Sequence, residues 1–169
     1  MPPQARLCAG FLRSGATKII APDDVPLRKS IQQHESFVPV IYDDATGKPL
    51  KRGDTLKGYA SIGYGRNLHE GISQLEADML LKNDISRSYN EAGKFAWWFD
   101  LNSPRQRVIV EMLYNLGKTR FLTFKNALKC LDMGMYDACA NELLDSKWAD
   151  QVGQRAVTLA AIMRTGEMP

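Results

Sequence analysis

The segment that most restricts the fold of this 169-residue chain is residues 103–116, which is apolar on nearly every side. Residues 102–104 (Asn-Ser-Pro) are typical of a helix start, and Gly117 is typical of a helix end. The apolar residues between them are Val108, Ile109, Val110, Met112, Leu113 and Leu116. A helix without a polar face has to be surrounded by other elements. The sequence therefore predicts a helical lobe built around this segment.

Further helix signals lie before and after residues 103–116. Ser73 and Glu76 have the spacing of a capping box, and they predict a long connecting helix over residues 73–94. We expect shorter helices at about residues 123–132, 136–144 and 153–165, with a turn near residues 145–150. The tryptophans Trp97, Trp98 and Trp148 are interpreted as packing residues.

A smaller part with strands precedes the long helix. A start signal at residues 23–26 predicts a short helix, and Leu27 and Ile31 lie on one face of it. One more turn of that face would carry Glu35 toward a core. After an apolar run, a loop or hairpin leads to a strand at residues 59–64.

Alternation in that strand places Ser61 and Gly63 on the less crowded face. Gly63 has no side chain, so a ligand can approach the backbone there. We therefore expect Ser61 and Gly63 to border a binding site.

Chain length and the 44% share of hydrophobic residues predict one domain with a core of its own, or two lobes that share a helix. The expected fold class is α+β, mainly helical. The domain would cover residues 23–169, divided into a small lobe (23–72), the connecting helix (73–94) and a helical lobe (95–169). Residues 1–22 are rich in Pro, Gly and Ala and are interpreted as an N-terminal extension.

Net charge and cysteine content exclude few classes of binding partner. A net charge of +3 and a pI near 8.8 give no argument for nucleic acid, but they are compatible with an anionic wall polymer. Cys8, Cys130 and Cys139 show neither a disulfide framework nor zinc-ligand spacing, so we expect free thiols and no metal site. Arg13 and Lys18 interrupt the N-terminal apolar stretch, which argues against a signal peptide and a membrane span.

Glu35 and Asp44, nine residues apart, and the hydroxyl of Ser61 are the candidate catalytic groups. Glycoside hydrolysis needs one carboxylic acid to protonate the leaving oxygen and a second carboxylate to handle the attacking water. By spacing alone, two solvated surface carboxylates are the favoured interpretation.

The surrounding motifs favour the catalytic interpretation. They are HESFVPVIYDD (34–44), GYASIGYG (58–65), YNLGKTRFLTFKNAL (114–128), LLDSKWADQVGQRA (143–156) and RTG (164–166). From about residue 26 onward the chain resembles the phage lysozymes of the T-even type, a muramidase family also called glycoside hydrolase family twenty-four. The resemblance implies a two-lobe lysozyme fold.

It also implies an activity: cleavage of the β-1,4 bond between N-acetylmuramic acid and N-acetylglucosamine in peptidoglycan, without a cofactor. Glu35 matches the general acid and Asp44 the second carboxylate. Ser61 stands where the family usually has Thr, so it keeps the hydroxyl but loses the methyl group that restricts its rotamer. The family is described as inverting, with Asp44 and Ser61 orienting the water.

Other positions carry over one at a time from the resemblance. Tyr114, Asn115 and Lys147 match substrate-binding residues of the cleft. Arg155 matches an arginine that pairs with the catalytic Glu and modulates it. These residues extend the expected site into the helical lobe.

One pair departs from the family pattern. The family often has His directly after the Gly-x-Gly motif, paired with an Asp of the long helix. This chain has Arg66 there, and Asp84 stands at the acidic position. We predict a structural ion pair between Arg66 and Asp84.

The resemblance implies a monomeric phage endolysin that is antimicrobial through host cell lysis. It would be made in the host cytoplasm and reach the wall in the periplasm through a holin. Two alternatives remain open: a lytic transglycosylase, which needs only the acid Glu35, and an inactive wall-binding or virion structural protein with the same fold.

Overall fold

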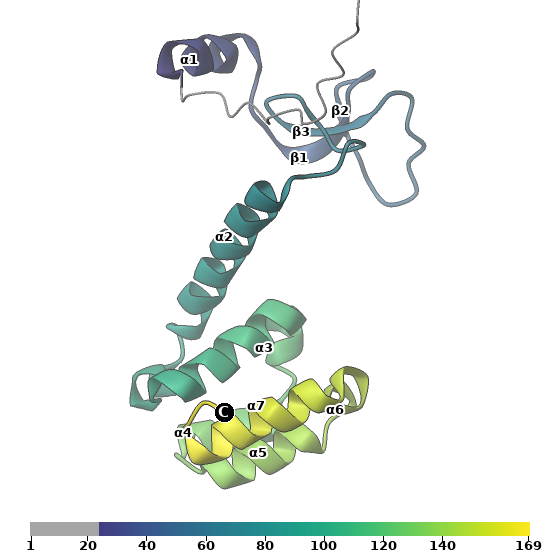
Figure 1. Cartoon of the computed structure of the whole chain (residues 1–169). Helices are drawn as coiled ribbons and strands as arrows, with labels where there is room; N and C mark the ends of the chain where they lie inside the picture. Colours follow the sequence, from purple (N-terminus) through teal and green to yellow (C-terminus); the bar gives the residue numbers. More distant parts are fainter. Residues whose placement is uncertain (1–23) are drawn as a thin grey trace, which may run out of the picture. The chain divides into compact units, whose positions relative to one another are not determined.

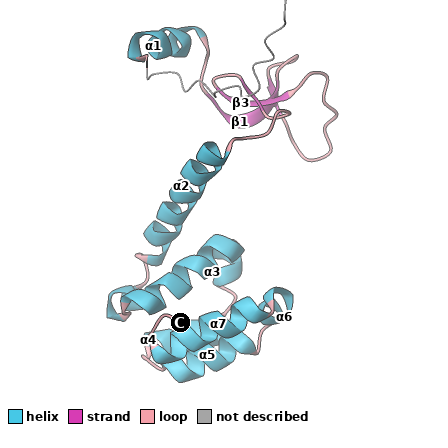
Figure 2. Ribbon diagram, in the orientation of Figure 1, coloured by secondary structure: helices cyan, strands magenta, loops and turns pink. Residues whose placement is uncertain are grey.

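A computed structural model describes residues 24–169 of the chain; the predicted extension at residues 1–22 and Cys8 lie outside them. The helices are α1 (Val25–His34), α2 (Gln74–Ala92), α3 (Ser103–Phe121), α4 (Lys125–Asp132), α5 (Tyr136–Leu144), α6 (Lys147–Val152) and α7 (Gln154–Thr165), and a 3-10 helix, η1 (Ala96–Asp100), precedes α3. The strands are β1 (Val38–Asp43), β2 (Lys48–Pro49), β3 (Ala60–Gly63) and β4 (Arg66–Asn67). The mainly helical α+β class is confirmed (Figures 1 and 2). Among these helices, none combines the length and apolar character that a membrane span requires.

The chain divides into two compact units at the bond between Gly71 and Ile72. We call the residues up to Gly71 the small unit and residues 72–169 the large unit. Each is described by itself.

The small unit holds an antiparallel four-stranded sheet in the order β2-β1-β3-β4. The register between β1 and β3 shifts between Val38 and Tyr42, around Pro39, which has no N–H to donate to the ladder. The predicted hairpin is confirmed, because β1 pairs with β2 across a tight turn at residues 44–47.

The described part of the small unit buries no apolar side chain. Leu27 is 56% exposed and Ile31 is 47% exposed, so the prediction that their face of α1 turns into a core was wrong. The two buried residues in the described part of the small unit are polar, Asp43 and Ser61.

The long helix α2 begins as the sequence predicts. The hydroxyl of Ser73 accepts the N–H of Glu76, and the Glu76 carboxylate accepts the N–H of Ser73, which confirms the capping box. The helix ends at Ala92, two residues before the predicted limit.

The apolar helix α3 provides the centre of the large unit. Its N-cap is Asn102, whose side chain accepts the N–H of Arg105. Gly117 interrupts the helix with φ 71° and ψ 159°, a left-handed φ that side chains disfavour, so the predicted helix end survives as a kink. The largest fully buried side chains of the unit are Phe121, Ile109, Met112, Met163, Val108 and Cys139.

The remaining helices pack around this core, with α5 against both α4 and α7 (Figure 1). The predicted bounds of α5 are confirmed, and α4 begins at Lys125 rather than Thr123. The prediction of a turn near residues 145–150 was wrong, because α6 forms there. Ser146 caps it by accepting the N–H of Ala149. Six residues are too few to show a helical period in the sequence.

Candidate active site

Glu35 lies where α1 passes into the sheet. The Asp24 side chain caps the start of α1 by accepting the N–H of Leu27. At the other end, the N–H of Glu35 closes the last turn on the carbonyl of Ile31, and the Glu35 backbone is extended. Glu35 is exposed, contrary to the expectation of a core-facing carboxyl. A Cβ built on Gly65 would lie 3.9 Å from its Oε2, so the carboxyl faces the turn after β3.

Asp44 directly follows β1 and is tied to the residue just before β3. Its N–H donates to the carbonyl of Tyr59 at 3.0 Å, and its Oδ1 accepts the N–H of Tyr59 at 2.7 Å. Among residues 24–169, Asp44 Oδ2 accepts no hydrogen bond. One oxygen of this exposed carboxylate is therefore fixed and the other is available.

Ser61 lies in the central strand β3, between Tyr42 of β1 and Asn67 of β4. It is 2% exposed, so the prediction of the less crowded face was wrong. Its hydroxyl makes no hydrogen bond to the described residues. Gly63, on the same strand, has no atom within 4 Å of a built Cβ, and its role in ligand binding stays a prediction.

Of the predicted substrate residues of the large unit, Tyr114 and Asn115 lie in α3 and Lys147 begins α6. Tyr114 is 47% exposed. The indole N–H of Trp148 donates to Oδ1 of Asn115 at 3.0 Å, which fixes the orientation of the Asn115 amide. Trp97, Trp98 and Trp148 are buried, and their interpretation as packing residues is confirmed.

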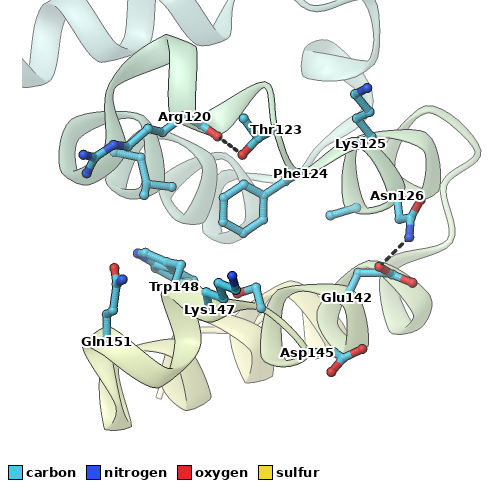
Figure 3. A pocket seen from close by; sticks show the side chains of 13 residues that line it. Arg120, Thr123, Phe124, Lys125, Asn126, Glu142, Asp145, Lys147, Trp148 and Gln151 are labelled. Carbon is cyan, nitrogen blue, oxygen red and sulfur yellow. Dashed lines mark hydrogen bonds between the residues drawn. The ribbon is translucent and has the colours of Figure 1, made fainter.

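Lys147 and Trp148 also line a pocket of about 480 Å³ in the large unit (Figure 3). The rings of Trp148 and Phe124 meet edge to face there, with their centroids 6.1 Å apart. Asn126 donates a hydrogen bond to Glu142 at 3.0 Å, so the pocket is lined by both charged and aromatic side chains (Figure 3).

Comparison with known proteins identifies the family. The family described as phage lysozyme matches residues 32–164. The chain belongs to the phage lysozyme family. It is 28% identical over 101 residues to probable T4-type lysozyme 1 of Dictyostelium discoideum, which covers 57% of this chain and 59% of that protein. It is 25% identical, with the same coverage, to probable T4-type lysozyme 2 of that organism. The chain thus matches about three fifths of the length of these relatives.

Arg155, a predicted site residue of this phage lysozyme family member, has a partner that the sequence did not indicate. Arg155 Nε donates to Oε1 of Glu111 at 2.8 Å, which joins α7 to α3. The sequence analysis missed Glu111; the only signal is one acidic residue among the apolar residues 108–113. Since Arg155 and Glu35 belong to different units, their pairing stays a prediction.

The pair of Arg66 with Asp84 also stays a prediction. Arg66 donates to the carbonyl of Gly71 at 3.0 Å, within the small unit. Asp84 forms an ion pair with Arg87, one turn farther along α2. Within residues 24–169, no three His, Cys, Asp or Glu side chains are grouped as metal ligands.

Proposed function

We propose that this member of the phage lysozyme family is a muramidase that hydrolyses the β-1,4 bond between N-acetylmuramic acid and N-acetylglucosamine in bacterial peptidoglycan. The observation that carries the proposal is the placement of three groups around β1 and β3. Glu35 faces the turn after β3, Asp44 is bonded to Tyr59, and Ser61 lies two residues farther along β3. A carboxylic acid, a carboxylate and a hydroxyl thus come from elements that are hydrogen-bonded or adjacent.

In the proposed reaction, protonated Glu35 donates its proton to the glycosidic oxygen as the bond to the anomeric carbon breaks. The free oxygen of Asp44 accepts a proton from a water molecule, and the Ser61 hydroxyl holds that water. The water oxygen attacks the anomeric carbon from the far face, so the product has inverted configuration. The chemistry needs no metal or cofactor.

We assign substrate binding to Gly63 in the small unit and to Tyr114, Asn115 and Lys147 in the large unit. The orientation of the Asn115 amide by Trp148 supports this assignment, because a fixed amide can discriminate between sugar substituents. Arg155, whose Nε is held by Glu111, is the proposed modulating residue.

The biological role we propose is that of a monomeric phage endolysin for host lysis. It would be made in the host cytoplasm and released through a holin to act on the wall in the periplasm. The Arg66 and Asp84 pair would serve a structural purpose. Nucleic acid is not a partner in this proposal.

A turbidity assay on permeabilised Gram-negative cells tests the activity. Wild type should clear the cells, whereas Glu35→Gln should lose at least 10²-fold in rate because the amide cannot donate the proton. The matched control is Glu70→Gln, an exposed carboxylate of the same unit, which should clear like wild type. If wild type clears no faster than Glu35→Gln, the chain is the inactive wall-binding or virion structural alternative.

Mass spectrometry of the digest separates hydrolysis from the transglycosylase alternative. Hydrolysis adds water and gives reducing muramic acid ends. Anhydromuropeptides as the main product would contradict the hydrolase and would leave Asp44 and Ser61 without their proposed role.

A further inference from the structure

Asp43, the neighbour of the proposed catalytic Asp44, is the most completely hydrogen-bonded carboxylate of the small unit. It is the last residue of β1 and is only 3% exposed. Its Oδ1 accepts the N–H groups of Ala45 at 3.0 Å and Gly58 at 3.1 Å, and its Oδ2 accepts the N–H of Lys57 at 2.7 Å. Both oxygens are therefore occupied by the protein itself, and Asp43 is unavailable to a substrate water.

These bonds hold the two ends of a loop together. We call these ends, Ala45 on one side and Lys57 and Gly58 on the other, the neck of the loop. Residues 45 and 57–58 stand at the two ends of the segment that leads from β1 to β3. The carbonyl of Asp43 also accepts the N–H groups of Thr46 and Gly47, at 3.2 and 2.8 Å. One residue thus joins both ends of the loop to the end of β1.

Gly58, at the neck of the loop, also lies beside the Asp44 side chain. A Cβ built on Gly58 would be 2.1 Å from Asp44 Oδ1, so the Gly58 backbone lies directly beside that carboxylate. The position of Gly58 is set by its bond to Asp43. A displaced Gly58 would change both the space for Asp44 Oδ1 and the adjoining bond from Tyr59.

We propose that Asp43 is a positioning residue for the reaction: its buried carboxylate holds the loop neck so that Asp44 keeps one oxygen bonded and presents the other to water. The inference rests on the proposed function. Backbone N–H groups, first that of Lys57, hold the pKa of Asp43 below its usual range, so the group stays ionised at neutral pH. An ionised carboxylate is a stronger acceptor than a neutral group, which suits a fixed anchor.

The test compares variants of Asp43 with a matched control in the same loop. Asp43→Asn keeps one oxygen for Ala45 and Gly58 but turns an NH₂ group toward the N–H of Lys57; Asp43→Ala loses all three bonds. The control is Asp54→Ala, an exposed carboxylate that accepts one N–H, that of Lys51 at 2.8 Å, away from the neck. The kcat and KM are measured on soluble glycan strands, and melting temperatures are recorded for each variant.

We expect kcat to fall about tenfold in Asp43→Asn and about 10²-fold in Asp43→Ala, with KM within about twofold of wild type, because a displacement of about 1 Å at a reacting group can cost that much. Asp54→Ala should stay within about twofold in kcat. Equal losses in the Asp43→Ala and Asp54→Ala proteins, or wild-type kcat in a folded Asp43→Ala protein, would overturn the inference.

An NMR measurement on the unsubstituted protein provides a readout that is independent of activity and of variant folding. The amide protons of Ala45, Lys57 and Gly58 should be shifted downfield and protected from exchange. Fast exchange at all three would show that Asp43 does not hold the neck and would overturn the inference. If wild type hydrolyses no glycan while these amides are protected, the proposed function fails and the anchor remains.

Discussion

At the scale of single residues, Gly58 is required because of the space around Asp44 and not because of an unusual φ. A built Cβ would meet Asp44 Oδ1 at 2.1 Å, the Ala45 Cβ at 2.8 Å and the Ala45 backbone nitrogen at 2.9 Å. Two of these contacts are with groups that cannot rotate away. The backbone at residues 44–45 or at residue 58 would have to shift.

We therefore predict that Gly58→Ala lowers the hydrolysis rate at least tenfold and destabilises the protein by about 1–3 kcal/mol, as overpacking does. Cell clearing and denaturant unfolding measure the two effects. Gly93→Ala is the control, because its Cβ would meet only backbone carbonyls at 3.5 and 4.0 Å. Wild-type activity in the Gly58→Ala protein would contradict the geometry.

Part of the candidate site could be predicted from the identities of its residues. The resemblance selected Asp44 rather than Asp43, and the bonds of Asp43 agree with that choice because they occupy both its oxygens. The burial of Ser61 was not predicted. Alternation along a strand defines two faces, but which face is buried depends on what packs against the sheet.

At the scale of elements, Glu91 links the end of α2 to α3. Its Oε2 lies 2.8 Å from Lys118 Nζ, and Lys94 bonds to Oε1. These two ammonium groups, first Lys118 and then Lys94, lower the pKa of Glu91 to about 2 from its ordinary 4.5. Glu91 therefore stabilises the fold fully above about pH 4.5, and this contribution is lost as the pH falls toward 2.

We predict that Glu91→Gln lowers the melting temperature at neutral pH and that the difference from wild type shrinks between pH 4.5 and pH 2. Calorimetry over this range measures it. Glu167→Gln, an exposed carboxylate near the C-terminus, should show no such trend. A Glu91→Gln difference that is constant down to pH 2 would show that the ion pairs contribute nothing.

Helix prediction succeeded where local chemistry decides. The capping box of α2 depends on two side chains within its first turn. The bounds of α5 also agree with the prediction, although its N-cap residue, Met135, makes no side-chain hydrogen bond. Helix α6 was missed because its six residues are too short for a period. The exposed face of α1 was missed because an apolar stripe indicates a side and does not tell whether that side is covered.

At the scale of the whole molecule, the core belongs to the large unit. Every buried apolar residue of the described chain lies at position 92 or later. The small unit depends on backbone pairing and on the anchors of Asp43 and Asp44. Since apolar burial is the main stabilising contribution to folding, the two units differ in their ability to fold alone.

We predict that a fragment of residues 72–169 folds with a cooperative thermal transition and that residues 24–71 alone do not. Circular dichroism at 222 nm during heating, at about 25 °C and above, measures both. A cooperative transition in the 24–71 fragment would contradict the expectation, as would its absence in the 72–169 fragment.

The sequence by itself determined the mainly helical class, the helix starts at Ser73 and Asn102, and the motifs of the phage lysozyme family, because each depends on residues close together in the chain. Only the tertiary structure decided that Asp43 anchors the loop while Asp44 keeps a free oxygen, and that Glu111 holds Arg155. The physical reason is separation: these partners lie 14 and 44 residues apart, and only packing of the elements brings such donors and acceptors within reach.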